Sequence, residues 1–248
     1  MKESFVNTVQ AECSQAIFKL VLFSYEKNEK SNGTAFIFYE DEKYYYLLTA
    51  YHCSKEGDRT RVLYLMDYKG EVVENVEILY EDKDYEQTIL RFKKSLLKDK
   101  REPLVISFKA KLQDKDDLLV VGSGDGYVNR VYCTNYVDLP IVLTMKEYDK
   151  LTDARKGKEI RQGVIQAVKQ SGLLFPNLER SNEFYSFLQD NNILTMGDIP
   201  GGFSGSPIFN TDFEVVGMIV FGWGDVSLGI LYSGLNEYLE KTVYKKED

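Results

Sequence analysis

The sequence predicts an all-β protein built from two packed antiparallel β-barrels. Aromatic residues are abundant, with 18 Tyr and 14 Phe among 248 residues, and such residues favour strands. Short runs rich in aromatic and β-branched residues follow one another, separated by turn sequences such as "KSNG" and "YKGE". These runs fall into two sets along the chain. Strands of this length and spacing are typical of a barrel or sandwich, and we expect two six-stranded barrels.

The first set of runs predicts a barrel over residues 16–98. It contains six strand-length segments, at 16–25, 33–40, 43–50, 61–68, 71–80 and 87–93. Residues 3–14 have the composition of a short helix, so residues 1–15 form a separate N-terminal helical segment in this interpretation.

The second set predicts a barrel over residues 99–231 with a helical insertion. Its strand-like segments are 103–108, 117–123, 127–136, 206–210 and 214–222. Helix-forming residues interrupt the strand pattern and predict a helical insert at about 140–190. The last segment, 232–248, predicts an amphipathic C-terminal helix.

Charge and cysteine content exclude several classes of protein. The formal net charge of −8 disfavours binding to a phosphate backbone, so nucleic acid is not an expected partner. No apolar run is long enough to cross a bilayer, and the N-terminus does not resemble a secretory signal. Cys13, Cys53 and Cys133 are scattered, without metal-ligand spacing. We therefore expect a cytoplasmic protein with reduced thiols, and neither a metal nor a cofactor.

Three segments contain the residues that could carry chemistry. Ser204 lies in "GGFSGSPIF" (201–209), where it is either a nucleophile or a polar residue of a glycine-rich turn. His52 is the single histidine, and it follows a strongly apolar strand, where a scaffold can present a catalytic group. Asp82, Asp84 and Glu86 precede the strand 87–93, so one of them could orient the imidazole, although each could also be a solvated turn residue.

Taken in order, these segments resemble the trypsin-like (chymotrypsin-fold) serine peptidases. The resemblance rests on "GTAFIF…YYYLLTAYHC", "YEQTILRF" and "GGFSGSPIFN…VVGMIVFG", and it covers residues 16–136 and 194–243. The motif "GGFSGSPIFN" is most similar to the bacterial glutamyl-endopeptidase and HtrA-like branches.

The resemblance implies a role for each residue. Ser204 would attack the scissile carbonyl, and His52 would act as general base and then as acid. Glu86 would hold the imidazole, and the N–H groups of Gly202 and Ser204 would form the oxyanion hole. Asp84 is the alternative acid, but choosing it would put Glu86 at a small buried position, so Glu86 is preferred.

The resemblance also indicates substrate contacts. Asp198 lies six residues before Ser204, the offset at which trypsin carries the acid of its P1 pocket, and this would favour cleavage after Arg or Lys. Alternatively, Asp198 is an exposed loop acid. The segment Val220, Phe221 and Gly222 matches the strand that binds the substrate backbone.

Two departures from the family concern control. Phe203 stands where members activated by zymogen cleavage carry Asp, and no Ile-Val-Gly-Gly-like start is present, so activation by a new N-terminus is not expected. The insert could gate the cleft or dock a regulatory protein partner.

The sequence thus predicts an intracellular serine endopeptidase acting on proteins or peptides. The alternative is a catalytically silent peptide-binding module on the same fold.

Overall fold

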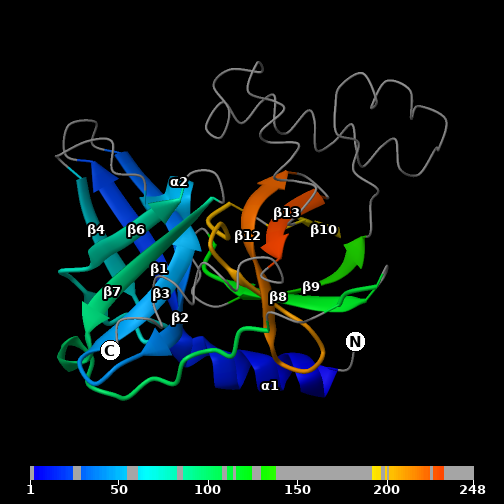
Figure 1. The fold of residues 1–248 in the computed structure, drawn as a ribbon, viewed down its shortest axis with the longest axis horizontal. Coiled ribbons are helices and arrows are strands. Elements are labelled where there is room, and N and C mark those ends of the chain that lie inside the picture. Colours follow the sequence, from blue (N-terminus) through cyan, green and yellow to red (C-terminus); the bar gives the residue numbers. More distant parts are fainter. Residues whose placement is uncertain are drawn as a thin grey trace, which may run out of the picture.

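Two antiparallel sheets, packed side by side, make up most of the described structure (Figure 1). The computed structural model describes residues 3–24, 29–54, 61–82, 86–107, 111–113, 116–124, 130–137, 192–196, 199, 201–223 and 226–231. Helix α1 (Glu3–Cys13) precedes the sheets and runs beneath them in Figure 1. A single 3₁₀ turn, Ser14–Ala16, joins this helix to the first strand.

The first sheet has seven strands in the order β5-β4-β1-β2-β3-β7-β6. Its strands are β1 (Ile17–Ser24), β2 (Glu29–Glu40), β3 (Tyr44–Ala50), β4 (Arg61–Met66), β5 (Val72–Val73), β6 (Glu77–Asp82) and β7 (Gln87–Lys93). The sequence predicted six strands here. The seventh arises because the run 71–80 is divided at Asn75, whose φ of 60° interrupts an extended strand.

The second sheet closes into a six-stranded barrel in the order β10-β13-β12-β11-β8-β9. Its strands are β8 (Asp117–Gly122), β9 (Arg130–Val137), β10 (Asn192–Met196), β11 (Pro207–Phe209), β12 (Val215–Trp223) and β13 (Val226–Leu231). The all-β architecture of two antiparallel units is therefore confirmed.

Two details of the second barrel differ from the expectation. The described part of the run 103–108, residues 103–107, forms no strand, and Ile106 makes an isolated bridge with Val215. Strands β10 and β13 were not predicted, because neither contains a long run of aromatic and β-branched residues. The proposed insert (about 140–190) and C-terminal helix (232–248) lie outside the described residues, and the domain boundaries stay predictions.

A shared hydrophobic core joins the two units. Strand β1 lies inside the first sheet, and seven of its eight residues are buried. One continuous cluster contains Phe18 and Phe36 of the first sheet together with Leu119, Phe209 and Met218 of the barrel. Burying a large apolar side chain contributes about 1.5–3 kcal/mol, so this shared core holds the two units against each other.

A buried ion pair fixes the connector between the units, the segment that leads from β7 to β8 and contains Arg101. Arg101 donates from its guanidinium to Asp67, at 2.6 Å, and both side chains are almost completely excluded from solvent. The Arg101 N–H donates to the Tyr45 hydroxyl, at 2.8 Å. Because buried charges require partners, these bonds tie the connector to the first sheet.

The described helices were compared with the length and hydropathy that a membrane span requires. Within the residues that the structure describes, no helix is long and apolar enough to cross a membrane.

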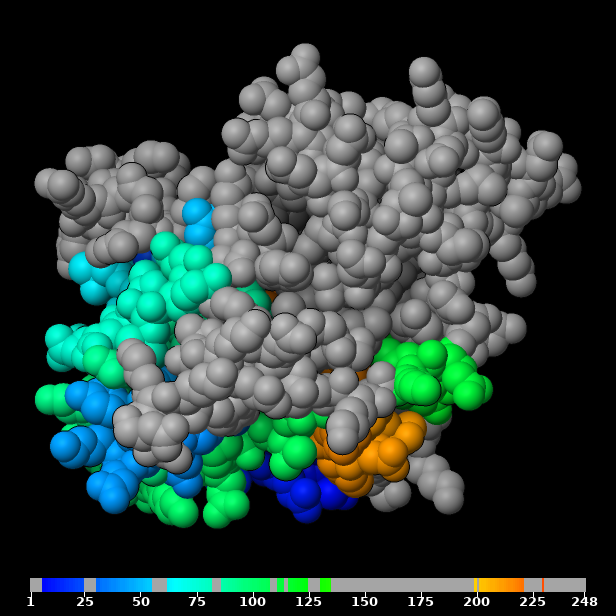
Figure 2. All heavy atoms as spheres, in the orientation of Figure 1, coloured from blue at the N-terminus to red at the C-terminus, as the bar shows by residue number. Residues whose placement is uncertain are grey.

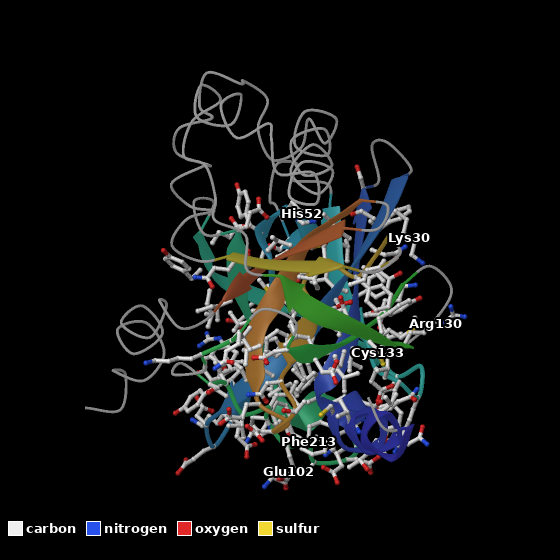
Figure 3. All side chains as sticks on the ribbon, turned by 90° about the vertical axis from the view of Figure 1, so that its right-hand side faces the viewer. Lys30, His52, Glu102, Arg130, Cys133 and Phe213 are labelled. Atoms are coloured by element: carbon white, nitrogen blue, oxygen red, sulfur yellow. The ribbon has the colours of Figure 1, made fainter. Side chains whose placement is uncertain are left out.

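The turn between β11 and β12, residues 211–213, is exposed and belongs to the orange patch at the lower edge of Figure 2. Figure 3 places Phe213, in this turn, near the lower end of the described structure and His52 near its upper end.

Candidate active site

His52 lies at the point where β3 ends. Strand β3 pairs with β7 in a register that sets Ala50 opposite Gln87, and the short helix α2 (Tyr51–Ser54) begins immediately afterwards. The Tyr51 N–H donates to the Glu86 carbonyl, at 3.0 Å. The pairing of two neighbouring strands thus brings His52 beside Glu86.

One carboxylate oxygen of Glu86 orients His52. The distance from His52 Nδ1 to Glu86 Oε2 is 2.9 Å, and the His52 backbone N–H lies 3.4 Å from the same oxygen. The Glu86 side chain is buried, whereas 22% of the His52 side chain remains exposed. With Nδ1–H donated to the carboxylate, the neutral imidazole presents an unprotonated Nε2, as a general base requires.

The electrostatics favour the protonated imidazole. Burial of His52 lowers its pKa, but interactions with the Cys53 sulfur and with the Glu86 carboxylate outweigh this effect and raise the pKa well above the ordinary 6.5. A neighbouring carboxylate stabilises the cation that forms when the base accepts a proton.

Glu86 adopts an uncommon backbone conformation, with φ of 51°. A non-glycine residue in the left-handed region costs on the order of 1 kcal/mol and is found preferentially at functional sites. Here the conformation occurs just before β7 begins, with the side chain directed to His52.

Helix α2 is anchored on β7 by a pair of hydroxyl groups. Ser54 Oγ lies 2.7 Å from Thr88 Oγ1, and both residues are buried. The helix that carries His52 is therefore attached to the strand that follows Glu86.

Ser204 lies in a turn shaped by two glycines. Gly202 and Gly205 have φ of 90° and 88°. Residues that carry a Cβ rarely adopt such values. A Cβ on Gly205 would lie 1.9 Å from the Thr34 carbonyl oxygen. Within the turn, the Ser206 N–H donates to the Phe203 carbonyl, at 2.9 Å, so the half-buried Ser204 lies on a tightly constrained backbone.

The His52 side and the Ser204 side meet at the Ser204 carbonyl oxygen. It accepts a hydrogen bond from the Thr34 N–H, at 2.8 Å, and lies 3.7 Å from the Cys53 sulfur. Cys53 directly follows His52, so the structure brings the histidine and serine segments together. Cys53 is a free thiol and is buried.

Phe203 anchors the turn in the core of the barrel. It is almost fully buried in a cluster with Val120, Ile208 and Ile219, and its ring meets Tyr132 edge-on at 5.0 Å. An apolar anchor therefore occupies the position before Ser204, where a zymogen-type Asp would need a charged partner.

Strand β12 passes directly beside the turn. The Gly205 N–H donates to the Ile219 carbonyl, at 2.6 Å, and the Ile219 N–H donates to the Ser206 carbonyl, at 2.9 Å. The pairing of β12 with β13 is irregular between Ile219 and Phe221. Val220 thus occupies a bulge next to the turn, and its side chain is buried in the shared core.

Other predicted site residues fall in different places. Phe221 and Gly222 lie in β12, immediately after Val220. Asp198 and Asp84 lie outside the described residues. Among the residues that the structure describes, no group of three His, Cys, Asp or Glu side chains could hold a metal ion.

The sequence reasoning missed Thr34. Its N–H contacts Ser204, and its hydroxyl donates to the Gly202 carbonyl, at 3.1 Å. The signal was a hydroxyl residue at the start of the segment "GTAFIF", but no local pattern indicates a contact with a turn 168 residues further along the chain.

Comparison with known proteins identifies the family. The model of the trypsin-like peptidase domain matches residues 33–218, well over half of the chain. The chain therefore belongs to the trypsin-like peptidase domain family.

The fold is similar to that of a solved protease. The crystal structure of the Rv3671c protease from M. tuberculosis, in its active form, superposes with a TM-score of 0.66 at 14% sequence identity. The match covers 98% of this chain and 87% of that chain. No curated protein matches the sequence.

Proposed function

We propose that this chain is a serine endopeptidase in which Ser204 is the nucleophile, His52 the general base and Glu86 the orienting acid. The observation that carries the proposal is the 2.9 Å contact between His52 Nδ1 and the buried Glu86 carboxylate. The glycine turn of Ser204, with positive φ at Gly202 and Gly205, lies against the residue that follows His52. Membership of a peptidase family supports the same conclusion.

The reaction begins with proton transfer from Ser204 Oγ to His52 Nε2. The oxygen attacks the scissile carbonyl carbon, and the carbonyl oxygen becomes an oxyanion that accepts hydrogen bonds from the N–H groups of Gly202 and Ser204. Glu86 holds the imidazolium that results and keeps its Nδ1 proton in place.

Collapse of the tetrahedral intermediate breaks the C–N bond. The leaving amine takes the proton from His52, and the acyl group remains on Ser204 as an ester. His52 then accepts a proton from water, the resulting hydroxide attacks the ester, and the proton passes back to Ser204 as the carboxylic acid leaves. No redox partner or metal takes part in these steps.

Substrate would extend along β12. Because the Val220 side chain is buried and the strand pairing is irregular there, Val220 would contribute backbone groups, followed by Phe221 and Gly222. We place Asp198 in the P1 pocket, which would select Arg or Lys. We further propose the HtrA-like or glutamyl-endopeptidase branch, a cytoplasmic location, and control by the 140–190 segment or by a protein partner.

Labelling with a serine-directed fluorophosphonate tests the proposal. We expect the wild type to be labelled and Ser204→Ala to be unlabelled. Ser206→Ala is the matched control, since the buried Ser206 hydroxyl has no hydrogen-bond partner in the described part of the chain, and it should be labelled like the wild type. A folded wild type that binds peptides but resists labelling would instead indicate the silent binding module.

Peptide-library profiling of the unlabelled wild type, which keeps a free Ser204 hydroxyl, tests the P1 assignment. Cleavage after Arg or Lys, lost in Asp198→Asn, is the expected result. Cleavage mainly after Glu or apolar residues would reject Asp198 as the specificity residue without rejecting the serine mechanism.

A further inference from the structure

Thr34 connects the first sheet to the turn that carries Ser204. It lies in β2 and is fully buried. Its backbone N–H donates to the Ser204 carbonyl, at 2.8 Å, and its hydroxyl donates to the Gly202 carbonyl, at 3.1 Å. One residue of the first unit therefore binds two peptide groups of the turn in the second.

The same hydroxyl also holds the segment that packs behind Gly202. The Ser123 N–H donates to Thr34 Oγ1, at 3.0 Å. A Cβ on Gly202 would lie 3.0 Å from the Ser123 carbonyl oxygen and 3.2 Å from Gly124 Cα. A hydroxyl can donate one hydrogen bond while accepting another, so Thr34 bridges the turn and the wall behind it.

Thr34 is itself held rigidly. The Thr49 hydroxyl donates to the Thr34 carbonyl, at 2.7 Å. Gly205 approaches the same carbonyl so closely that no larger residue would fit. The Thr34 backbone is thus held by β3 on one side and by the turn on the other, and its hydroxyl is held by the bonds to Gly202 and Ser123.

Gly202 needs such an anchor. Glycine rotates freely about φ and ψ, and the peptide groups on both sides of Gly202 could reorient without steric cost from a side chain. Binding its carbonyl restricts ψ of Gly202 and, with the packing of residues 123–124, restricts the direction of its N–H. Oxyanion stabilisation depends on donors that are oriented before the reaction begins.

We propose that Thr34 is a positioning residue for the oxyanion hole, acting through Gly202. The inference rests on the proposed function, because it assigns Thr34 to the hole formed by Gly202 and Ser204. Thr34 does not touch the substrate in this assignment. Its hydroxyl keeps the Gly202 N–H aimed at the reacting carbonyl.

The kinetic test compares Thr34→Val with Thr34→Ser. Valine keeps the branched shape but removes the donor and the acceptor, and we expect kcat to fall roughly 10- to 100-fold, less than the loss of a direct oxyanion donor. KM should change by less than about threefold, because ground-state binding along β12 is unaffected. Serine retains the hydroxyl and should restore kcat to within about threefold of the wild type.

Val73→Ala is the control for destabilisation alone. Val73 is buried in β5, three strands from β2 in the order of the first sheet. It should lower stability without lowering kcat. A fall in kcat of equal size in Val73→Ala and Thr34→Val would reduce Thr34 to a structural residue and overturn the inference.

Amide hydrogen exchange gives a readout that does not require activity. Exchange in residues 201–206 should be roughly tenfold faster in Thr34→Val than in the wild type, and unchanged in Thr34→Ser and Val73→Ala. Unchanged exchange in Thr34→Val would also overturn the inference. If the wild type neither hydrolyses peptides nor reacts with fluorophosphonate, the proposed function fails, while this measurement still decides whether Thr34 fixes the turn.

Discussion

The two sides of the candidate site are held by different forces. On the His52 side, a charged side chain, Glu86, holds the functional group, and the contact joins two neighbouring strands of one sheet. On the Ser204 side, the turn is held by uncharged backbone hydrogen bonds and by the buried ring of Phe203. The pH dependence should therefore arise from the first side, and the stability of the site from the second.

This contrast has a physical basis in the chemistry assigned to each side. The base must change its protonation state during the reaction, so a carboxylate beside it is useful throughout the cycle. The oxyanion donors must stay fixed, and neutral hydrogen bonds with close packing provide rigidity without adding charge. Substitutions on each side should consequently produce different signatures.

The largest effect is expected from Glu86→Gln. An amide that donates to Nδ1 would stabilise the tautomer with its proton on Nε2, so His52 could not accept the Ser204 proton. We expect kcat/KM to fall by about 10³- to 10⁴-fold, equivalent to about 4–5.5 kcal/mol. Steady-state kinetics on a peptide substrate measures this change.

Glu77→Gln is the matched control for Glu86→Gln. Glu77 pairs with Arg91 on β7 but is about half exposed, and an exposed ion pair contributes little. Its kcat/KM should match the wild type. Equal activity of Glu86→Gln and the wild type would remove Glu86 from the site.

Phe203→Ala should act mainly on stability. Removing a buried aromatic ring from a packed cluster typically costs about 3–5 kcal/mol, and chemical denaturation should show a loss of about this size. The exposed Phe213 provides the same substitution outside the core, with an expected loss below about 1 kcal/mol. If both variants lose the same stability, Phe203 does not anchor the turn.

The smallest effect, and the sharpest contrast, is expected in the pH profile. Because the His52 pKa is raised above 6.5, kcat/KM of the wild type should fall as pH decreases through a midpoint above 6.5. In Glu86→Gln the residual activity should show this midpoint at a lower pH than the wild type, since the carboxylate, one of the groups that raise the His52 pKa, is gone. In Phe203→Ala the midpoint should stay unchanged.

The same pKa shift has a consequence for folding stability. A pKa that is higher in the folded than in the unfolded state means that the folded protein binds the proton more tightly. The contribution of His52 to stability is thus complete below pH 6.5 and is lost as pH rises through the folded pKa. A midpoint of the kcat/KM profile at or below pH 6.5 would contradict both statements.

The sequence by itself determined the features that depend on local pattern. Runs rich in aromatic and β-branched residues, separated by turn sequences, predicted most of the strands, and the end of an apolar strand located His52. The spacing of glycines located the Ser204 turn, because only glycine accepts the φ values found at Gly202 and Gly205. Aligning the strand 87–93 with the family's pattern also favoured Glu86 over Asp84 as the acid. The residues by themselves left both as candidates.

The tertiary structure decided what depends on residues distant in the chain. The strand pairing that sets His52 2.9 Å from Glu86 joins residues 34 positions apart. The contact of Thr34 with the Gly202 turn spans 168 positions. No sequence period extends over such distances. The first contact forms only when β3 pairs with β7, and the second forms only when the two sheets pack on their shared core.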